Sequence, residues 1–129
     1  MSIEKHGKNI DTNLKILIIS QYFWPENFRI NELTEELIKL GHDITVLTGY
    51  PNYPNGEIYK EFKKNKYKFS KYKGMKIIRI PILPRKKDKV NLIINYLSFL
   101  FNSIIIGYFK LRGKEFDIIF TFQLSPVTI

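Results

Sequence analysis

The stretch LKILIISQYFWPENFRINELTEELIKLGHDITVLT, residues 14–48, decides the fold. Its first seven residues form an apolar run of strand length rich in Ile and Leu, which is typical of a strand buried on both faces of a parallel sheet. A helical pattern of apolar residues follows at 29–40, and Gly41 is a suitable stop. Residues 43–48 again have the β-branched composition of a strand. The order strand, helix, strand predicts a right-handed crossover unit in a Rossmann-like α/β fold.

The helix at 29–40 is predicted to have one buried face. Apolar residues recur there at helical spacing, while three glutamates and a lysine lie off that line. The apolar stripe consists of Ile30, Leu33, Leu37 and Leu40. We therefore expect these four side chains to pack against the sheet.

Further strands are predicted at 75–83 and 116–122. The first contains Pro81, which favours a sheet edge or the end of the strand because proline cannot donate a backbone hydrogen bond. The second, FDIIFTF, has the apolar composition of a buried strand. Residues 60–73 contain only scattered aromatic residues among lysines, and we predict no regular structure for them.

We expect one domain over 14–129, a Rossmann-like parallel sheet flanked by helices, after a flexible lead-in at 1–13. A chain of 129 residues can enclose one core, and 44% hydrophobic and 15% aromatic residues favour a folded protein. The absence of cysteine excludes disulfides and thiolate metal sites, and no His/Asp/Glu cluster indicates a metal. The lead-in lacks the apolar core of a signal peptide, so we expect a cytoplasmic protein.

Positive charge is concentrated at 60–89, where thirteen residues are Lys or Arg and two are Asp or Glu. Such a segment can bind nucleic acid, anionic lipid or a phosphorylated substrate, or it can be a solvated lysine-rich surface. Aromatic residues between the lysines keep base stacking among the alternatives. These aromatic residues are Phe62, Tyr67, Phe69 and Tyr72.

Residues 90–109 carry no charge and have basic residues on both sides, as a transmembrane helix would. However, a polar stripe runs along the predicted helix at helical spacing. It consists of Asn91, Asn95, Ser98 and Asn102. We expect a long helix packed on the sheet with this stripe toward solvent or a cleft. A membrane-surface helix and a transmembrane span are the alternatives.

In an open parallel sheet, ligands bind beyond the carboxyl ends of the strands. The rim loops that this rule predicts are 21–28, 49–56, 84–89 and 123–129. In the first loop, Asn27 is a suitable N-cap for the helix that follows. The helix N-terminus would then offer backbone N–H groups to a phosphate or carboxylate.

The aromatic residues of the first rim loop suit the flat face of a sugar or a lipid chain. The alternative is that Phe23 and Trp24 fold back as a hydrophobic lid on the helix. We predict Glu26 to be a first-turn acid that favours the helix dipole, with a contact to a substrate hydroxyl as the alternative. His42 is expected to cap helix carbonyls. Glycine is absent from 21–40, which excludes a dinucleotide fingerprint, and no P-loop frame is present.

Residues 14–56 read LKILIISQYFWPENFRINELTEELIKLGHDITVLTGYPNYPNG. This block resembles the opening of retaining, family 4-type glycosyltransferases of the GT-B fold, which include bacterial capsule, O-antigen and colanic-acid sugar transferases. The combination of QYFWPENFRIN with the later GHDITVLTGYPNYPNG is similar to the subgroup of L-fucosamine and colanic-acid transferases. Residues 76–81 and 116–128 resemble the family more weakly, but in the right order.

The resemblance implies a Rossmann-like N-terminal domain that receives the acceptor, while a C-terminal domain with a Glu-x7-Glu pair holds most of the donor. It implies transfer of a sugar from a nucleotide-sugar to a lipid-linked saccharide acceptor in cell-surface polysaccharide synthesis, without metal or cofactor. The catalytic residue stays unidentified. The implied substrate-binding residues are Phe23, Trp24, Pro25, Glu26, Asn27, Phe28, Arg29, Tyr50, Asn52, Tyr53, Gln123 and Ser125.

The resemblance also implies that these residues form an incomplete N-terminal half of a GT-B fold, without the donor-binding domain and inactive alone. Because the acceptors lie at the inner face of the cell membrane, we expect a peripheral location there. No nucleic-acid partner is implied. The alternative is a noncatalytic Rossmann-like module that binds anionic membrane or nucleic acid through 60–89. The residues expected to bind the membrane are Arg85, Lys86, Lys87 and Lys89.

Overall fold

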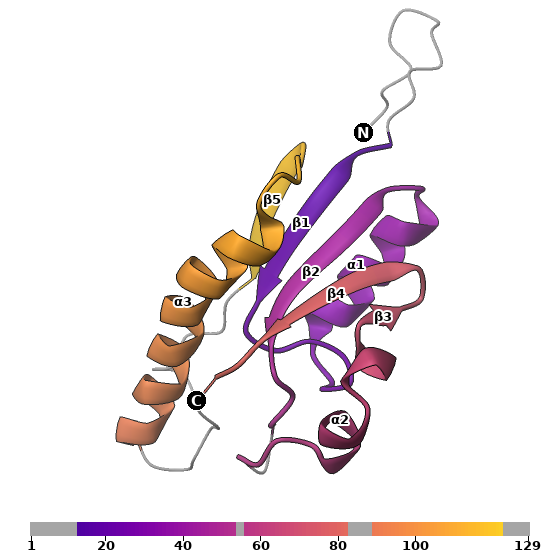
Figure 1. Ribbon diagram of the computed structural model, residues 1–129. Helices are drawn as coiled ribbons and strands as arrows, with labels where there is room; N and C mark the ends of the chain where they lie inside the picture. The colour runs from indigo at the N-terminus through magenta and orange to yellow at the C-terminus, as the bar shows by residue number, and fades with distance from the viewer. Residues whose placement is uncertain (1–12, 54–55, 83–88, 123–129) are drawn as a thin grey trace, which may run out of the picture.

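The computed structural model describes residues 13–53, 56–82 and 89–122 and shows one five-stranded sheet flanked by helices (Figure 1). The strand order is β3-β4-β2-β1-β5; β4, β2, β1 and β5 run parallel, and β3 is antiparallel to β4. This confirms the predicted Rossmann-like α/β fold. The elements are β1 (Lys15–Ser20), α1 (Arg29–Lys39), β2 (Asp43–Gly49), α2 (Lys60–Lys64), the 3-10 helix η2 (Lys66–Phe69), β3 (Lys71–Tyr72), β4 (Met75–Ile80), α3 (Lys89–Leu111) and β5 (Ile118–Phe122).

The sheet has a core on each face because successive side chains of a strand point to opposite sides. Helix α1 covers one face and α3 lies across the other (Figure 1). The cluster on the α1 side contains Ile16, Ile18, Phe23, Ile30, Ile44, Val46, Met75 and Ile77. The cluster on the α3 side contains Leu17, Leu47, Ile80, Ile82 and Phe99. The apolar runs of β1 and β2 are therefore explained by burial on both faces.

Helix α1 buries a different stripe from the predicted one. Leu33 and Leu40 are 40% and 68% exposed, whereas Asn31 and Thr34 are buried. The Asn31 side-chain nitrogen donates to the carbonyl of Glu26 (2.7 Å), and the Thr34 hydroxyl donates to the carbonyl of Asn31 (2.8 Å). The buried face thus includes two polar residues because the preceding loop and the helix itself supply hydrogen-bond partners.

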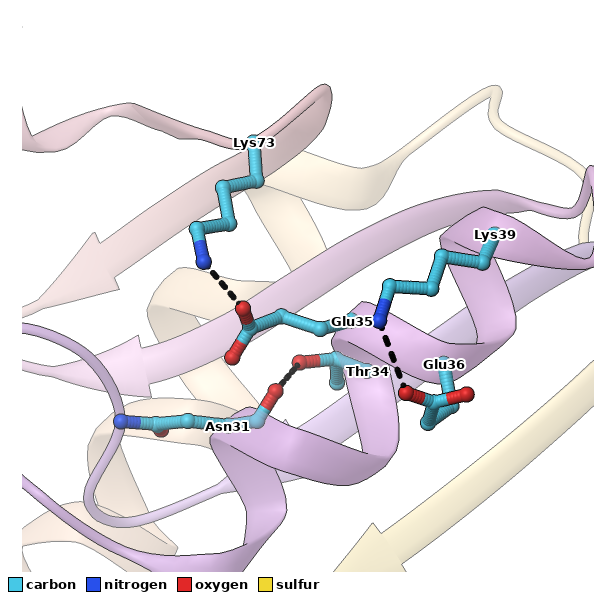
Figure 2. A network of polar contacts seen from close by, with 6 residues as sticks. All are labelled: Asn31, Thr34, Glu35, Glu36, Lys39 and Lys73. Carbon is cyan, nitrogen blue, oxygen red and sulfur yellow. Dashed lines mark hydrogen bonds and ion pairs between the residues drawn. The ribbon is translucent and has the colours of Figure 1, made fainter.

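Two glutamates of α1 form ion pairs with lysines, as Figure 2 shows. Lys73, at the turn between β3 and β4, pairs with Glu35, and Lys39 Nζ lies 3.0 Å from Glu36 Oε1. Both lysines are more than half exposed, and ion pairs in contact with solvent contribute little to stability. The position of α1 therefore depends on its packing against the sheet.

The segment 60–73, for which we predicted no regular structure, folds into α2, η2 and β3. Phe62 and Phe69 are 2% and 7% exposed, so these two aromatic rings cannot stack on nucleic-acid bases. Strand β3 pairs only with the first two residues of β4. Strand β4 ends at Ile80, short of the predicted 75–83, so Pro81 lies at the end of the strand, one of the two positions expected for it.

Strand β5 lies where we predicted a strand, but its expected burial is wrong. It pairs with β1 and forms one edge of the sheet in the described residues. Ile118, Ile119 and Phe120 are 45%, 63% and 41% exposed. No described element covers these side chains, so their apolar composition is not explained by the described contacts alone.

Helix α3 packs on the sheet as predicted; of the polar stripe that we expected toward solvent or a cleft, Asn95 and Asn102 bind loops of the protein. Asn95 is 1% exposed, and its Oδ1 accepts hydrogen bonds from the Tyr22 hydroxyl (2.8 Å) and from Gln21 Nε2. The Asn102 side-chain nitrogen donates to the carbonyl of Pro81 (2.5 Å). The stripe turns inward because loops at the end of the sheet supply partners for these amides.

The inward polar stripe leaves apolar side chains on the opposite side of α3. Gly107 brings the helix close to β2, since a Cβ there would lie 2.9 Å from Leu47 Cδ2. The stretch Ile93–Leu111 is long and apolar enough to cross a membrane, judged by length and composition alone. We call the exposed apolar surface the outer face of α3; it consists of Ile93, Ile94, Leu97, Leu100, Phe101, Ile104, Ile105, Tyr108 and Phe109, each between 38% and 65% exposed.

Gly49, the last residue of β2, is expected to tolerate no side chain. An added Cβ would lie 2.7 Å from Ile82 Cδ1 and 3.3 Å from the carbonyl oxygen of Gln21. Gly49→Ala should therefore lower the free energy of unfolding by about 1 to 3 kcal/mol through overpacking. Urea denaturation measures this, and adding Ile82→Val, which removes Cδ1, should restore part of the loss. Wild-type stability of Gly49→Ala would contradict the prediction.

Candidate functional site

The rim of the sheet is formed, in the described residues, by the loops that follow β1 and β2. The loops are neighbours because the two strands pair in parallel. The carbonyl of Gln21 accepts from the Gly49 backbone N–H and from the Thr48 hydroxyl, both at 3.3 Å. The loops at 84–88 and 123–129 lie outside the described residues. So do five predicted residues and the side chain of a sixth, namely Gln123, Ser125, Arg85, Lys86, Lys87 and Lys89.

Glu26 joins the two rim loops from the inside. Its side chain is 1% exposed, and Oε2 accepts from the backbone N–H groups of Asn52 (3.0 Å) and Tyr53 (2.7 Å). The prediction of a first-turn acid is wrong because α1 begins at Arg29 and the carboxyl group binds the other loop. Burial also keeps the carboxyl away from solvent. Glu26 is therefore a positioning residue that fixes one loop against the other.

Burial raises the pKa of Glu26 from 4.5 to about 7. The backbone N–H groups of Asn52 and Tyr53 and the charge of Arg79 oppose this rise. Glu26 Oε1 has no hydrogen-bond partner among the described residues. An ionised carboxylate with an unpaired buried oxygen is costly, so the neutral form persists to higher pH. The rim thus contains a carboxyl group that titrates near neutrality.

Arg79 is a second buried charged group, although we predicted it as part of the basic surface segment. It is 6% exposed, and its guanidinium donates to the carbonyls of Phe69 (3.0 Å), Gly49 (3.4 Å) and Trp24. Burial lowers the pKa of Arg79 to about 10, and the charge of Glu26 opposes this change. The guanidinium therefore stays protonated at neutral pH and connects η2, the end of β2 and the first rim loop.

Three aromatic residues form a cluster at the rim, which we call the rim cluster: Tyr22, Phe28 and Tyr53. The rings of Tyr22 and Phe28 are stacked with centroids 5.0 Å apart, and Phe28 meets Tyr53 edge-on at 4.9 Å. Tyr22 is buried, but Phe28 and Tyr53 are partly exposed. A partly exposed aromatic surface of this kind suits the apolar face of a sugar ring or a prenyl chain.

Phe23 and Trp24, which the resemblance implied as cleft residues, pack into the protein. Phe23 is 0% exposed and belongs to the core cluster on the α1 side. Trp24 is stacked on Tyr72, with centroids 4.4 Å apart, and its peptide bond to Pro25 is cis. The structure is therefore closer to the alternative, in which Phe23 and Trp24 fold back as a hydrophobic lid. Trp24, however, covers the 60–73 segment and not the helix.

The remaining predicted residues divide between surface and interior. Asn27 and Arg29 are exposed, and the N-cap of α1 is Phe28, without a side-chain capping bond. Asn52 is 0% exposed, and its side-chain nitrogen donates to the carbonyl of Tyr50 (2.9 Å). The predicted cap at Asn27 is thus wrong, and Asn52 supports the loop instead of facing a ligand.

A groove of about 420 Å³ lies beside the part of β4 that does not pair with β3, between η2 and α3. Its floor is largely apolar, its border carries lysines, and none of its lining residues is acidic. Such a groove attracts anionic ligands. Its lining residues are Tyr50, Phe62, Lys66, Tyr67, Phe69, Ser70, Ile77, Ile78, Arg79, Lys110 and Lys114.

Clustered metal ligands are absent from the part of the chain that the structure describes. No group of three or more His, Cys, Asp or Glu side chains is arranged to hold a metal ion there. His42 Nδ1 accepts from the backbone N–H of Leu14 (3.1 Å). The histidine is structural, and its backbone N–H donates to the carbonyl of Leu37 in α1 (3.2 Å), so it caps a helix carbonyl as expected.

No protein-family model, no curated protein and no solved structure matches this chain. A functional assignment therefore rests on the rim geometry and on the resemblance of residues 14–56 described above. Three rim residues were missing from the predicted set: Tyr22, Arg79 and Asn95. Arg79 carried a usable signal, because it lies two residues after Ile77 and four after Met75, on the same face of β4 as these two core residues.

Replacement of Arg79 should destabilise the protein strongly. Arg79→Met leaves three carbonyl groups and the Glu26 carboxyl without their cation, and we expect a loss of about 3 to 5 kcal/mol in the free energy of unfolding. Arg79→Lys should recover little because an ammonium group cannot reproduce the planar fork. The control is Lys76→Met on the same strand, whose side chain is exposed. Equal urea midpoints for the Arg79→Met and Lys76→Met variants would contradict the role of Arg79.

Glu26 should make stability fall as the pH rises. The pKa of Glu26 is about 7 in the folded protein and 4.5 in the unfolded chain. The neutral carboxyl group therefore stabilises the folded state fully below pH 4.5, and this stabilisation is lost as the pH rises through about 7. The loss amounts to roughly 3 kcal/mol. Because other groups also titrate, the measured quantity is the difference in unfolding free energy between wild type and Glu26→Gln from pH 4.5 to about pH 8. A difference that does not change with pH would show that Glu26 titrates normally.

Proposed function

We propose that this chain is the acceptor-side domain of a nucleotide-sugar-dependent glycosyltransferase that acts on a lipid-linked saccharide. The observation that carries the proposal is the pair of rim loops after β1 and β2, which Glu26 joins and which present the rim cluster. In an open α/β sheet this edge is where ligands bind. In the proposal, a second domain outside these residues supplies most of the donor site.

The rim cluster suits an acceptor that has both a sugar part and a lipid part. Phe28 and Tyr53 offer partly exposed ring faces, which pack well on the apolar side of a pyranose or on an isoprenoid unit. The Tyr22 hydroxyl is engaged with Asn95, so its ring is held in place under Phe28. A preorganised aromatic surface loses little conformational freedom when a ligand binds.

The proposal assigns no catalytic residue. Glu26 is buried and bound to backbone N–H groups, so its part is to set the shape of the acceptor surface. The sugar donor would require no metal or cofactor from this domain, as the resemblance implies. The expected cytoplasmic location, peripheral at the inner face of the cell membrane, belongs to the same proposal.

A second candidate function is a noncatalytic module that binds an anionic partner. The groove between η2 and α3 favours it, since lysines at positions 66, 110 and 114 border an apolar floor. A ligand of this module would contact the groove and leave the rim cluster untouched. The two candidates therefore predict different contact residues for the same probe.

Amide chemical shifts of the isotope-labelled chain, titrated with farnesyl-diphosphate-linked N-acetylglucosamine, test the proposal. We expect shifts at Phe28, Gly49 and Tyr53, and weaker shifts there with farnesyl diphosphate alone. Tyr53→Ala should weaken binding about five- to tenfold, the effect of one lost aromatic contact. Tyr67→Ala is the matched control because Tyr67 is 74% exposed and lies outside the rim cluster. Shifts confined to Lys66, Ser70 and Lys114 would favour the second candidate and contradict the first.

A further inference from the structure

The outer face of α3 combines features that are unusual for a helix at the surface of a protein in water. Nine large apolar side chains are exposed along one side, while Asn95 and Asn102 of the same helix bind loops at the end of the sheet. Contiguous exposed apolar surface on this scale marks an interaction site. The absence of charge over twenty residues, 90–109, extends the apolar surface along most of the helix.

Positive charge flanks this apolar surface at both ends. Lys110 lies in the last turn of α3, Arg112 and Lys114 follow the helix, and all three are exposed. In the sequence, 85–89 contributes four basic residues and one aspartate before the first turn. An apolar face between two cationic ends is complementary to an anionic lipid surface, where acyl chains lie below negatively charged headgroups.

We infer that the outer face of α3 inserts into the interface of an anionic membrane, with the helix axis in the plane of the bilayer. Phe101, Ile104 and Tyr108 lie on one line at helical spacing and would enter the boundary between headgroups and acyl chains. Arg112 and Lys114, which follow the helix and are exposed, would bind lipid phosphates. The inference concerns the membrane contact alone and does not depend on the proposed transfer of sugar.

The contacts of the inner side of α3 explain why the helix lies on the membrane instead of crossing it. Asn95 is hydrogen-bonded to Tyr22 and Gln21, Phe99 is 7% exposed, and Gly107 packs on Leu47. A transmembrane position would separate these contacts and bring the polar stripe into hydrocarbon. The sheet instead holds the helix on one side and leaves the other side free for lipid.

A second copy of the chain is a poorer occupant of the outer face. The chain carries a formal net charge of +9, and basic residues stand at both ends of α3. Two outer faces in contact would bring cationic ends together in either a parallel or an antiparallel arrangement. Anionic lipid neutralises the same charges.

Vesicle flotation of the complete 129-residue chain tests the inference, with phosphatidylcholine vesicles containing about a third phosphatidylglycerol. The test variant is Phe101→Glu with Ile104→Glu, two outer-face residues that are each 64% exposed. The matched control is Leu33→Glu with Leu40→Glu, exposed apolar residues of α1 on the opposite side of the sheet. Both variants change the net charge equally.

We expect wild type and the α1 control to float with the vesicles, with partition coefficients within about threefold of each other. The α3 variant should bind at least about tenfold more weakly, since two charges then face the acyl boundary. Arg112→Gln with Lys114→Gln should weaken binding to the anionic vesicles and leave binding to pure phosphatidylcholine vesicles unchanged.

Several results would overturn the inference. Equal binding of the α3 and α1 variants, or no binding of wild type, would exclude the outer face as a membrane contact. Retention of wild type on vesicles after an alkaline carbonate wash would indicate a transmembrane helix. A wild-type dimer in light scattering that becomes a monomer in the α3 variant, with neither binding vesicles, would assign the face to a second copy.

Discussion

The hydrogen bonds from the backbone N–H groups of Asn52 and Tyr53 to the carboxyl group of Glu26 are the contact on which the rim depends. They join the loops that leave two neighbouring parallel strands, and each loop supplies part of the aromatic surface. Arg79 adds a second connection from β4, through carbonyl groups of Trp24 and Gly49. Glu26 and Arg79 are both buried, so solvent screens the interaction between their charges less than it would at the surface.

The same loops also orient α3. Tyr22, which stacks in the rim cluster, donates its hydroxyl hydrogen bond to Asn95, and the exit from β4 accepts one from Asn102. The polar stripe of the helix is thereby used inside the protein, and its apolar residues remain outside. The proposed acceptor surface at the rim and the proposed lipid contact of α3 therefore depend on one set of hydrogen bonds.

The fold could be predicted from the sequence because its signals are local. Apolar runs identified β1, β2 and β5, and periodicity identified α1 and α3, since these patterns depend on a few adjacent residues. Which side of a helix faces the protein depends on distant partners. Asn31 and Asn95 are buried because Glu26, Gln21 and Tyr22 offer hydrogen bonds, and no pattern within either helix contains that information.

The candidate site could be predicted only in part, because the exposure of its side chains also depends on partners that are distant in the sequence. The two rim loops followed from strand order, and Phe28 and Tyr53 are partly exposed there. Phe23, Trp24 and Asn52 carry side chains that also suit a ligand, but the fold uses them in its interior.

Amide hydrogen exchange at Asn52 and Tyr53 tests the central claim most directly, because it observes the two N–H groups that bind Glu26. In the wild type both amides should be strongly protected, and in Glu26→Ala both should lose protection together while the amide of Val46 in β2 keeps it. Exchange at the rate of a free loop in the wild type, or unchanged protection in Glu26→Ala, would contradict the claim that this carboxyl group organises the rim.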